Sequence, residues 1–109
     1  MKRYRYDATY DTLSYRLDRG RYAKSIEFGD IVLDIGEDGT VVGIRIFEAS
    51  QLFGLEREHL VRVRDFRFSV ERSSGVVSLN VSFVPLADGE PLLRQRLIRE
   101  LPEPAAIPF

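Results

Sequence analysis

The sequence predicts a mainly β fold, either an antiparallel sheet or a β-sandwich, with about seven or eight strands in hairpins and one short helix near residues 49–55. Apolar and polar residues alternate with a period of two along most of the chain, as they do in half-buried strands. Turn-forming Gly, Asp and Ser residues interrupt this alternation at short intervals. One segment loses the alternation, and it has room for about two helical turns.

The first expected strand is short and has two different faces. Tyr4 and Tyr6 share one face, and Arg3 and Arg5 share the other. A turn rich in Asp and Thr follows, and the second expected strand covers residues 12–18. The apolar face of that strand consists of Leu13, Tyr15 and Leu17, and its polar face of Thr12, Ser14, Arg16 and Asp18.

Three more strands are expected before residue 50, at residues 26–28, 31–35 and 40–47. Gly39 closes a Gly-Glu-Asp-Gly loop between the last two, and it can take the positive φ that a short hairpin demands. The inward face of the last of these strands is expected to be Val42, Ile44 and Ile46.

Residues 49–55 form the expected helix, and Ser50 is expected to cap it because a hydroxyl can accept from the amides of the first turn. Pro85 is expected to end the strand in which it lies. Residues 92–101 fit a strand or a helix, and the hairpin-like turn before them favours a strand. The Pro-rich tail, residues 102–109, is expected to be extended.

The strand that begins near residue 61 has apolar side chains on two phases. Val61 and Val63 lie on one phase, whereas Phe66 and Phe68 lie on the other. A regular strand cannot bury both sets, so the pattern predicts a bulge or bend near residues 64–65. A turn at Ser-Ser-Gly then leads to a returning strand whose apolar residues are Val77, Leu79, Val81 and Phe83.

Length and composition predict a single domain over residues 1–109, with hairpins in 1–50, a helix and further hairpins in 51–101, and the tail. The 16 basic and 17 acidic residues are mixed along the chain, so nucleic acid gains no electrostatic attraction. The absence of cysteine excludes disulfides and thiolate chemistry. The charged start has no apolar run behind it, and we therefore expect no membrane segment and a cytoplasmic location.

The acidic loop that starts at Asp34 partly matches a calcium-binding loop. Its third position is Gly36 and its twelfth is Arg45, where oxygen ligands are required, so the match fails. A hairpin turn with solvated carboxylates explains the loop. We therefore predict no metal or cofactor site there.

Other chemically active residue types occur without partners in the sequence. Asp7 and Asp11 flank a turn, which they are expected to stabilise. His59 is the single histidine, and an exposed structural position is expected for it. Ser50 lacks the Gly-x-Ser-x-Gly elbow of hydrolases. No catalytic residue is predicted, although a fold that gathers Asp7, Asp11, Asp34 and His59 in one cleft would make a small enzyme the alternative.

The segment 62–72 interleaves arginine with phenylalanine, in the manner of a platform on which bases stack. A weak nucleic-acid binder that uses this strand is thus a further alternative. The chain lacks net positive charge, which favours Phe66 and Phe68 as core residues instead.

The first half of the chain contains a series of short motifs in a fixed order. They are Tyr6-Asp7, Asp11-x-Leu13-x-Tyr15-x-Leu17, Ser25-Ile-Glu27, Ile31-x-Leu-Asp34, Glu37-Asp-Gly39, Val42-Gly-Ile44 and Phe47-Glu-Ala-Ser50. In these motifs the chain resembles the domain of unknown function 2283 family of small prokaryotic proteins. This resemblance implies a small β-rich unit with a short helix and without established enzymatic activity or functional residues, and some members are encoded beside toxin-like proteins.

Together these observations predict a small non-enzymatic module that binds a protein, such as a toxin-like protein encoded beside it. Open strand edges must be paired or covered, and the tail is apolar, so a homodimer is also expected.

Overall fold

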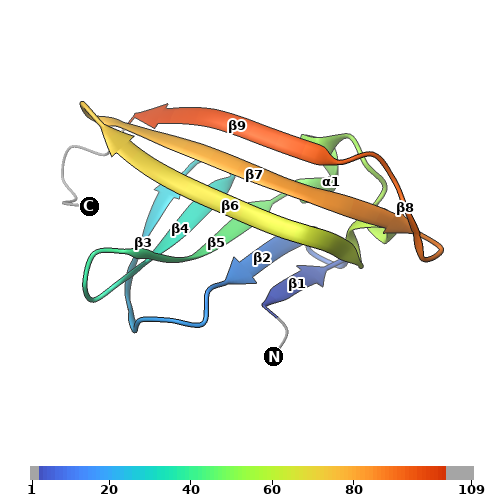
Figure 1. The fold of residues 1–109 in the computed structure, drawn as a ribbon, viewed down its shortest axis with the longest axis horizontal. Helices are drawn as coiled ribbons and strands as arrows, with labels where there is room; N and C mark the ends of the chain where they lie inside the picture. Colours follow the sequence, from blue (N-terminus) through green and yellow to red (C-terminus); the bar gives the residue numbers. More distant parts are fainter. Residues whose placement is uncertain (1–2, 103–109) are drawn as a thin grey trace.

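The computed structural model describes residues 3–102 and is a β-sandwich of two antiparallel sheets (Figure 1). The first sheet has the strand order β1-β2-β5-β4-β3. In the second sheet β7 lies centrally and pairs with β6, β8 and β9. The elements are β1 (Tyr4–Asp7), β2 (Thr12–Arg16), β3 (Tyr22–Phe28), β4 (Ile31–Gly36), β5 (Val41–Phe47), α1 (Ala49–Phe53), the 3-10 helix η1 (Arg57–Leu60), β6 (Val63–Ser73), β7 (Val76–Ala87), β8 (Glu90–Pro91) and β9 (Gln95–Pro102).

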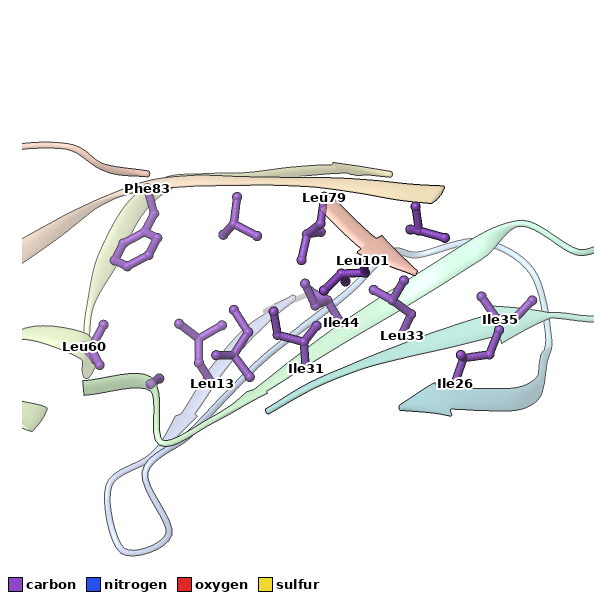
Figure 2. Packing of buried hydrophobic residues seen from close by; sticks show 14 residues of the cluster. Leu13, Ile26, Ile31, Leu33, Ile35, Ile44, Leu60, Leu79, Phe83 and Leu101 are labelled. Carbon is purple, nitrogen blue, oxygen red and sulfur yellow. The ribbon is translucent and has the colours of Figure 1, made fainter. Parts of the chain in front are cut away.

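The core lies between the two sheets, and Figure 2 shows its side chains reaching toward each other from both. Alternation along the strands delivers these residues, because every second side chain points inward. Each fully buried Leu, Ile or Phe stabilises the fold by roughly 1.5–3 kcal/mol relative to an exposed position. The buried cluster comprises Leu13, Ile26, Ile31, Leu33, Ile35, Ile44, Ile46, Ala49, Leu60, Val77, Leu79, Val81, Phe83 and Leu101.

The predicted fold class is confirmed, since the chain is mainly β with two antiparallel sheets and one short α-helix in the described residues. The bulge near residues 64–65 is also confirmed. The β6–β7 register shifts between Arg64 and Arg67, and Asp65 takes a left-handed φ of 54°. Residues 95–102 form a strand rather than a helix. The expectation for the Pro-rich tail falls mostly outside the described residues.

Pro85 does not end its strand as expected, because β7 continues to Ala87. The amide of Leu86 donates to the carbonyl oxygen of Arg62 on the β6 side. Successive residues of a strand point their amides to opposite sides, so the position without an N–H at Pro85 faces away from β6. On that side the carbonyl oxygen of Pro85 accepts from the amide of Leu92 at 2.9 Å, so the strand continues although the position has no donor of its own.

Val42 is buried as expected, but it does not join the central cluster. The β4–β5 register shifts between Asp34 and Ile35, so that Val41 packs toward the core in its place. The Cγ1 of Val42 instead lies close to Gly20 and Gly36, where an added Cβ would come within 3.0 Å of it. This bulge cannot be predicted from period-two alternation, and it is the reason that the inward face of β5 contains Val41 instead of Val42.

Ser50 does not cap α1, which corrects a third expectation. The helix starts at Ala49 after Glu48, whose φ of 54° is left-handed and whose side chain makes no capping bond. The Ser50 hydroxyl donates instead to the Oδ2 of Asp11 at 2.6 Å. Within residues 3–102 no helix has the length and apolarity that a membrane crossing requires.

Candidate functional site

The outer face of the first sheet carries a hollow of about 350 Å³, which we call the arginine hollow. Strand order creates it, because β2 pairs with β1 on one side and with β5, rather than β3, on the other. Two small residues, Ser14 and Gly43, occupy the centre of that face, with long side chains on each side. The residues that line the hollow are Arg3, Arg5, Ser14, Tyr15, Arg16, Asp34, Ile44 and Arg45.

The register of the sheet explains how arginines surround the hollow. Ser14 lies between Arg5 of β1 and Arg45 of β5. In the next row, Gly43 lies between Arg16 of β2 and Asp34 of β4. Ser14 therefore has an arginine on each side, and Gly43 has an arginine on one side and an aspartate on the other.

Asp34 fixes the position of Arg45 in this hollow. The Arg45 Nη2 donates to the Oδ1 of Asp34 at 2.8 Å and to the Oγ of Ser25 at 3.0 Å. Ser25 Oγ in turn donates to Asp34 Oδ1 at 2.8 Å, and it lies 2.6 Å from the hydroxyl of Tyr22. Asp34 is 9% exposed, so the expected solvated carboxylate is instead buried and paired.

Arg45 retains one donor without a partner. Its Nε is buried, and within the described part of the chain no acceptor lies in hydrogen-bonding range of it. Leaving a buried donor unsatisfied costs about 1–3 kcal/mol. This cost is part of the geometry that pairs the other end of the guanidinium with Asp34.

The hollow is strongly positive for a chain of net charge −1. Its lining contains four arginines and one aspartate, a local sum of +3 from 4 − 1. Arg3, Arg5 and Arg16 are exposed, and their guanidinium groups make no ion pair within residues 3–102. Guanidinium groups bind carboxylates and phosphates through paired hydrogen bonds, so this hollow is suited to an anion.

A second, larger cleft of about 750 Å³ lies at the edge of the sandwich, between the β1–β2 hairpin and β6. Its aromatic side is made by Tyr4, Tyr15 and Phe66, with Tyr15 and Phe66 stacked at a centroid distance of 4.6 Å. The hydroxyl of Tyr4 donates to the carbonyl oxygen of Leu60 at 2.6 Å. This aromatic cleft shares Arg3 and Tyr15 with the arginine hollow, so the two form neighbouring parts of one surface.

The aromatic residues of segment 62–72 pack toward the sandwich interior, as predicted. Phe66 stacks on Phe83 at 5.8 Å, and Phe68 meets Tyr15 edge-on at 5.9 Å. The bulge at Asp65 places both phenylalanines on the core side and leaves Arg67 exposed. The stacking platform for bases is therefore not formed by these rings.

Asp11 was expected to stabilise the turn in which it lies, but its side chain also bonds to a segment far along the chain. It is 2% exposed, and it accepts from the amide and hydroxyl of Ser50 at 3.0 and 2.6 Å and from the hydroxyl of Tyr6 at 2.6 Å. Burial alone would raise the pKa of Asp11, but these hydrogen bonds outweigh it and lower that pKa below its usual value. Asp11 thus joins the β1–β2 turn to the start of α1.

The other candidate residues have separate surroundings. Asp7 accepts from the amides of Thr9 and Tyr10 at 2.9 and 3.2 Å, so it stabilises the turn as predicted. His59 lies in η1 and is partly buried rather than exposed, in a pocket of about 110 Å³. Among the bonds in the described chain, none joins two of the four side chains at positions 7, 11, 34 and 59.

The sheet register also shows that Asp11 and Asp34 are far apart. Asp34 lies in the same row of the sheet as Arg16, two strands away, whereas Asp11 precedes Arg16 by five residues along the chain. That offset corresponds to about 16 Å along the strand. Within residues 3–102 no three His, Asp or Glu side chains are grouped as metal ligands would be.

The arginine hollow was not predicted from the sequence. Alternation assigned Arg3 and Arg5 to one face of their strand, and Ser14 and Arg16 to one face of the next. The missing information was that β5, with Arg45, lies beside β2.

Comparison with known proteins confirms the resemblance stated for the first half of the chain. Residues 3–50 match the family described as "Protein of unknown function (DUF2283)". This range contains all five strands of the first sheet and the whole lining of the arginine hollow.

Two archaeal proteins are similar over a larger part of the chain. A Methanosarcina mazei protein named "Putative hypoxanthine phosphoribosyltransferase" is 33% identical over 79 residues, which are 72% of this chain and 64% of that protein. The match therefore spans less than two thirds of that relative. An uncharacterized protein of Methanocaldococcus jannaschii is 26% identical over 97 residues, covering 88% of this chain and 84% of its own length. No solved structure matches.

Proposed function

We propose that this chain, whose residues 3–50 match the DUF2283 family, is a small non-enzymatic module that binds an acidic segment of a protein partner in the arginine hollow. The observation that supports this proposal is the convergence of four arginines on one hollow in a chain without net positive charge. Arginines that face solvent without a carboxylate are costly to gather, since like charges repel. An anionic partner would offset that repulsion.

The chemistry of the hollow favours binding over catalysis. Asp34 is its one carboxylate, and its Oδ1 accepts from both Arg45 and Ser25. This carboxylate serves to hold a guanidinium in place, and no second carboxylate or histidine lines the hollow to share acid–base work. The hollow therefore offers positioned donors, as a recognition surface does.

The neighbouring aromatic cleft supports a protein as the partner. A protein interface combines an apolar, aromatic centre with charged contacts at the rim. The cleft supplies Tyr4, Tyr15 and Phe66, and Arg3 connects it to the arginine hollow. An acidic side chain in the hollow and an apolar one in the cleft could belong to one segment of the partner. A toxin-like protein encoded beside this chain is the partner class that the family resemblance suggests.

The test uses the full chain and two matched double variants. R5A with R16A removes two exposed arginines of the hollow, and R64A with R99A removes two exposed arginines of the second sheet. The probes are a polyglutamate peptide and the proteins encoded beside this chain, measured by calorimetry and by co-purification. We expect loss of binding in the first variant alone, and equal binding by both variants would overturn the proposal.

A phosphate-bearing ligand is a second candidate. The name of the Methanosarcina mazei relative mentions phosphoribosyl transfer, and guanidinium groups take phosphate as readily as carboxylate. Titration with inorganic pyrophosphate tests this candidate directly. Binding of pyrophosphate, lost in the R5A/R16A variant and without binding of the peptide, would favour the phosphate ligand over the acidic protein segment.

A further inference from the structure

We propose that two copies of this chain associate face to face through the outer side of the second sheet, with charges that complement each other across a two-fold axis. This surface lies on the opposite side of the sandwich from the arginine hollow and is independent of the proposed function. The sheet consists here of β6, β7 and β9 (Figure 1).

The outer side chains of this sheet are arranged in rows of different charge. In one row Arg67 and Arg96 flank Ser82. A second row lies four residues further along β6 and β9, and in it Glu71 and Glu100 flank Ser78. The basic and acidic rows thus stand at opposite ends of one face.

A row without charge separates the two charged rows. Ser69 and Ile98 flank Asn80 in this central row. Ile98 is 69% exposed and supplies the one large apolar side chain of this row. Successive rows are two residues apart, so each charged row lies roughly 7 Å from the central one.

This order of rows is self-complementary. A two-fold axis that lies in the interface along the central row brings the basic row of one copy over the acidic row of the other. Arg67 would then face Glu71 of the second copy, and Arg96 would face Glu100 of that copy. Ile98 would meet its own equivalent near the axis.

The same geometry excludes the alternative axis for a face-to-face pair. An axis along the strands would place arginine over arginine and glutamate over glutamate, and like charges that face each other at an interface are unfavourable. The rows therefore select one arrangement of two. Aligned sheets pack about 30° apart because of their twist, which these long side chains can follow.

The basic row is reinforced by Arg94, which lies over Ser82. Its Nη1 donates to the Oγ of Ser82 at 2.8 Å, and its Nη2 donates to the Oδ2 of Asp65 at 3.3 Å. These bonds hold a third guanidinium at the basic end of the face. The basic end therefore presents an organised positive surface to the glutamates of the second copy.

The size of the face limits the strength of the association. Three strands about 4.8 Å apart and three rows about 7 Å apart span roughly 300 Å² of each copy once side chains are included. That area is smaller than the roughly 800 Å² per partner of a stable, specific interface. We therefore expect a weak dimer that dissociates at micromolar concentration, forms toward millimolar concentration and weakens as salt is added.

Charge reversal tests the pairing in the full chain. R67E with R96E places glutamates against Glu71 and Glu100 of the other copy, and should raise the dimer dissociation constant at least about tenfold. E71R with E100R alone should do the same. All four substitutions together restore the complementary rows and should restore the dimer. The measurement is sedimentation equilibrium over a wide concentration range.

The control and the contrary outcomes are distinct. R5E with R16E changes the arginine hollow by the same charge and should leave the dimer unchanged, whereas it should abolish binding of the acidic probe. All substituted positions are exposed to solvent, so each variant is expected to fold. A thermal melt of each variant checks this expectation. A monomer at every concentration, a dimer unaffected by reversal, or failure of the fourfold variant to recover would each overturn this face-to-face dimer.

Discussion

Gly43 lies opposite Asp34 in the β4–β5 pair, and a Cβ on Gly43 would lie 3.2 Å from Asp34 Oδ2 and 3.2 Å from the carbonyl oxygen of Tyr15. One of these atoms belongs to the side chain that fixes Arg45, and the other to the backbone of β2. The absent side chain therefore keeps the arginine hollow open and leaves Asp34 its place.

Substitution of Gly43 by alanine should damage the hollow more than the fold. The Cβ would displace Asp34, and Arg45 would lose its partner. We expect a stability loss of about 1–2 kcal/mol from the close backbone contact. Calorimetric titration should show weaker binding of the acidic probe than wild type. Alanine at Gly29, where a Cβ meets nothing within 4 Å but φ is +65°, is the control for a general glycine effect. Loss of probe binding in G29A as well would contradict the specific role of Gly43.

Substitution of Asp11 by asparagine should destabilise the protein strongly. The buried carboxylate accepts from three donors, and an amide at that position cannot accept from all of them. We expect a decrease of about 2–3 kcal/mol in the free energy of unfolding, measured by urea denaturation. Asp7 is the matched control because it accepts from exposed turn amides, so D7N should cost less. Equal losses in the two variants would show that burial of Asp11 contributes nothing.

Acid should destabilise the fold through Asp11. The pKa of Asp11 is lowered in the folded state, so the unfolded chain binds its proton first as pH falls. The stabilisation by this group is therefore complete well above pH ~4, the usual aspartate pKa, and is lost as pH falls through the lower folded value. Urea denaturation between neutral and acidic pH measures this slope. The D11N variant should show a shallower slope, and an unchanged one would contradict the assignment.

Alkaline pH should destabilise the fold through two tyrosines. Burial is the main cause that raises the pKa of both Tyr4 and Tyr6. The charge of the nearby Tyr6 raises the pKa of Tyr4 further, and the hydrogen bond to Asp11 raises the pKa of Tyr6 further. The folded state then holds protons that the unfolded chain releases near pH ~10, so stability is complete below that pH and falls above it. Y4F and Y6F should each flatten the decline, followed by circular dichroism. Y10F is the control, because Tyr10 is 76% exposed.

Truncation of Phe83 should cost the most of any single core change considered. It is fully buried, and its ring contacts Phe53 edge-on at 4.8 Å and Phe66 at 5.8 Å. F83A leaves a cavity among these rings, with an expected loss of about 3–5 kcal/mol in denaturant unfolding. L93A, at a position that is 85% exposed, should change stability by less than about 0.5 kcal/mol.

The local elements of this fold could be predicted because the signals for them are local. Period-two alternation identified the hairpins, and the two phases around residue 65 required the bulge that the register contains. The left-handed conformation of Gly39 followed from a hairpin turn. Each of these features depends on residues within a few positions of each other.

The candidate site could not be predicted because its geometry is non-local. Leu13 pairs with Ile46, and that pairing places Arg45 next to Ser14. Many strand orders satisfy the same alternation, and the sequence alone does not choose between them. The bond of Asp11 to Ser50 spans 39 positions for the same reason, and the local signal at Ser50 indicated only a helix cap.

The shared core has a consequence for any protein that carries the family segment alone. The inner face of the first sheet, with Leu13, Leu33 and Ile44, is buried by side chains from β7 and β9. A chain cut after residue 50 would expose that apolar face to water and would aggregate unless another molecule covered it. The second sheet thus covers the first sheet as a partner subunit would. Because both sheets belong to one chain, the effective concentration of this cover is higher than that of a separate protein.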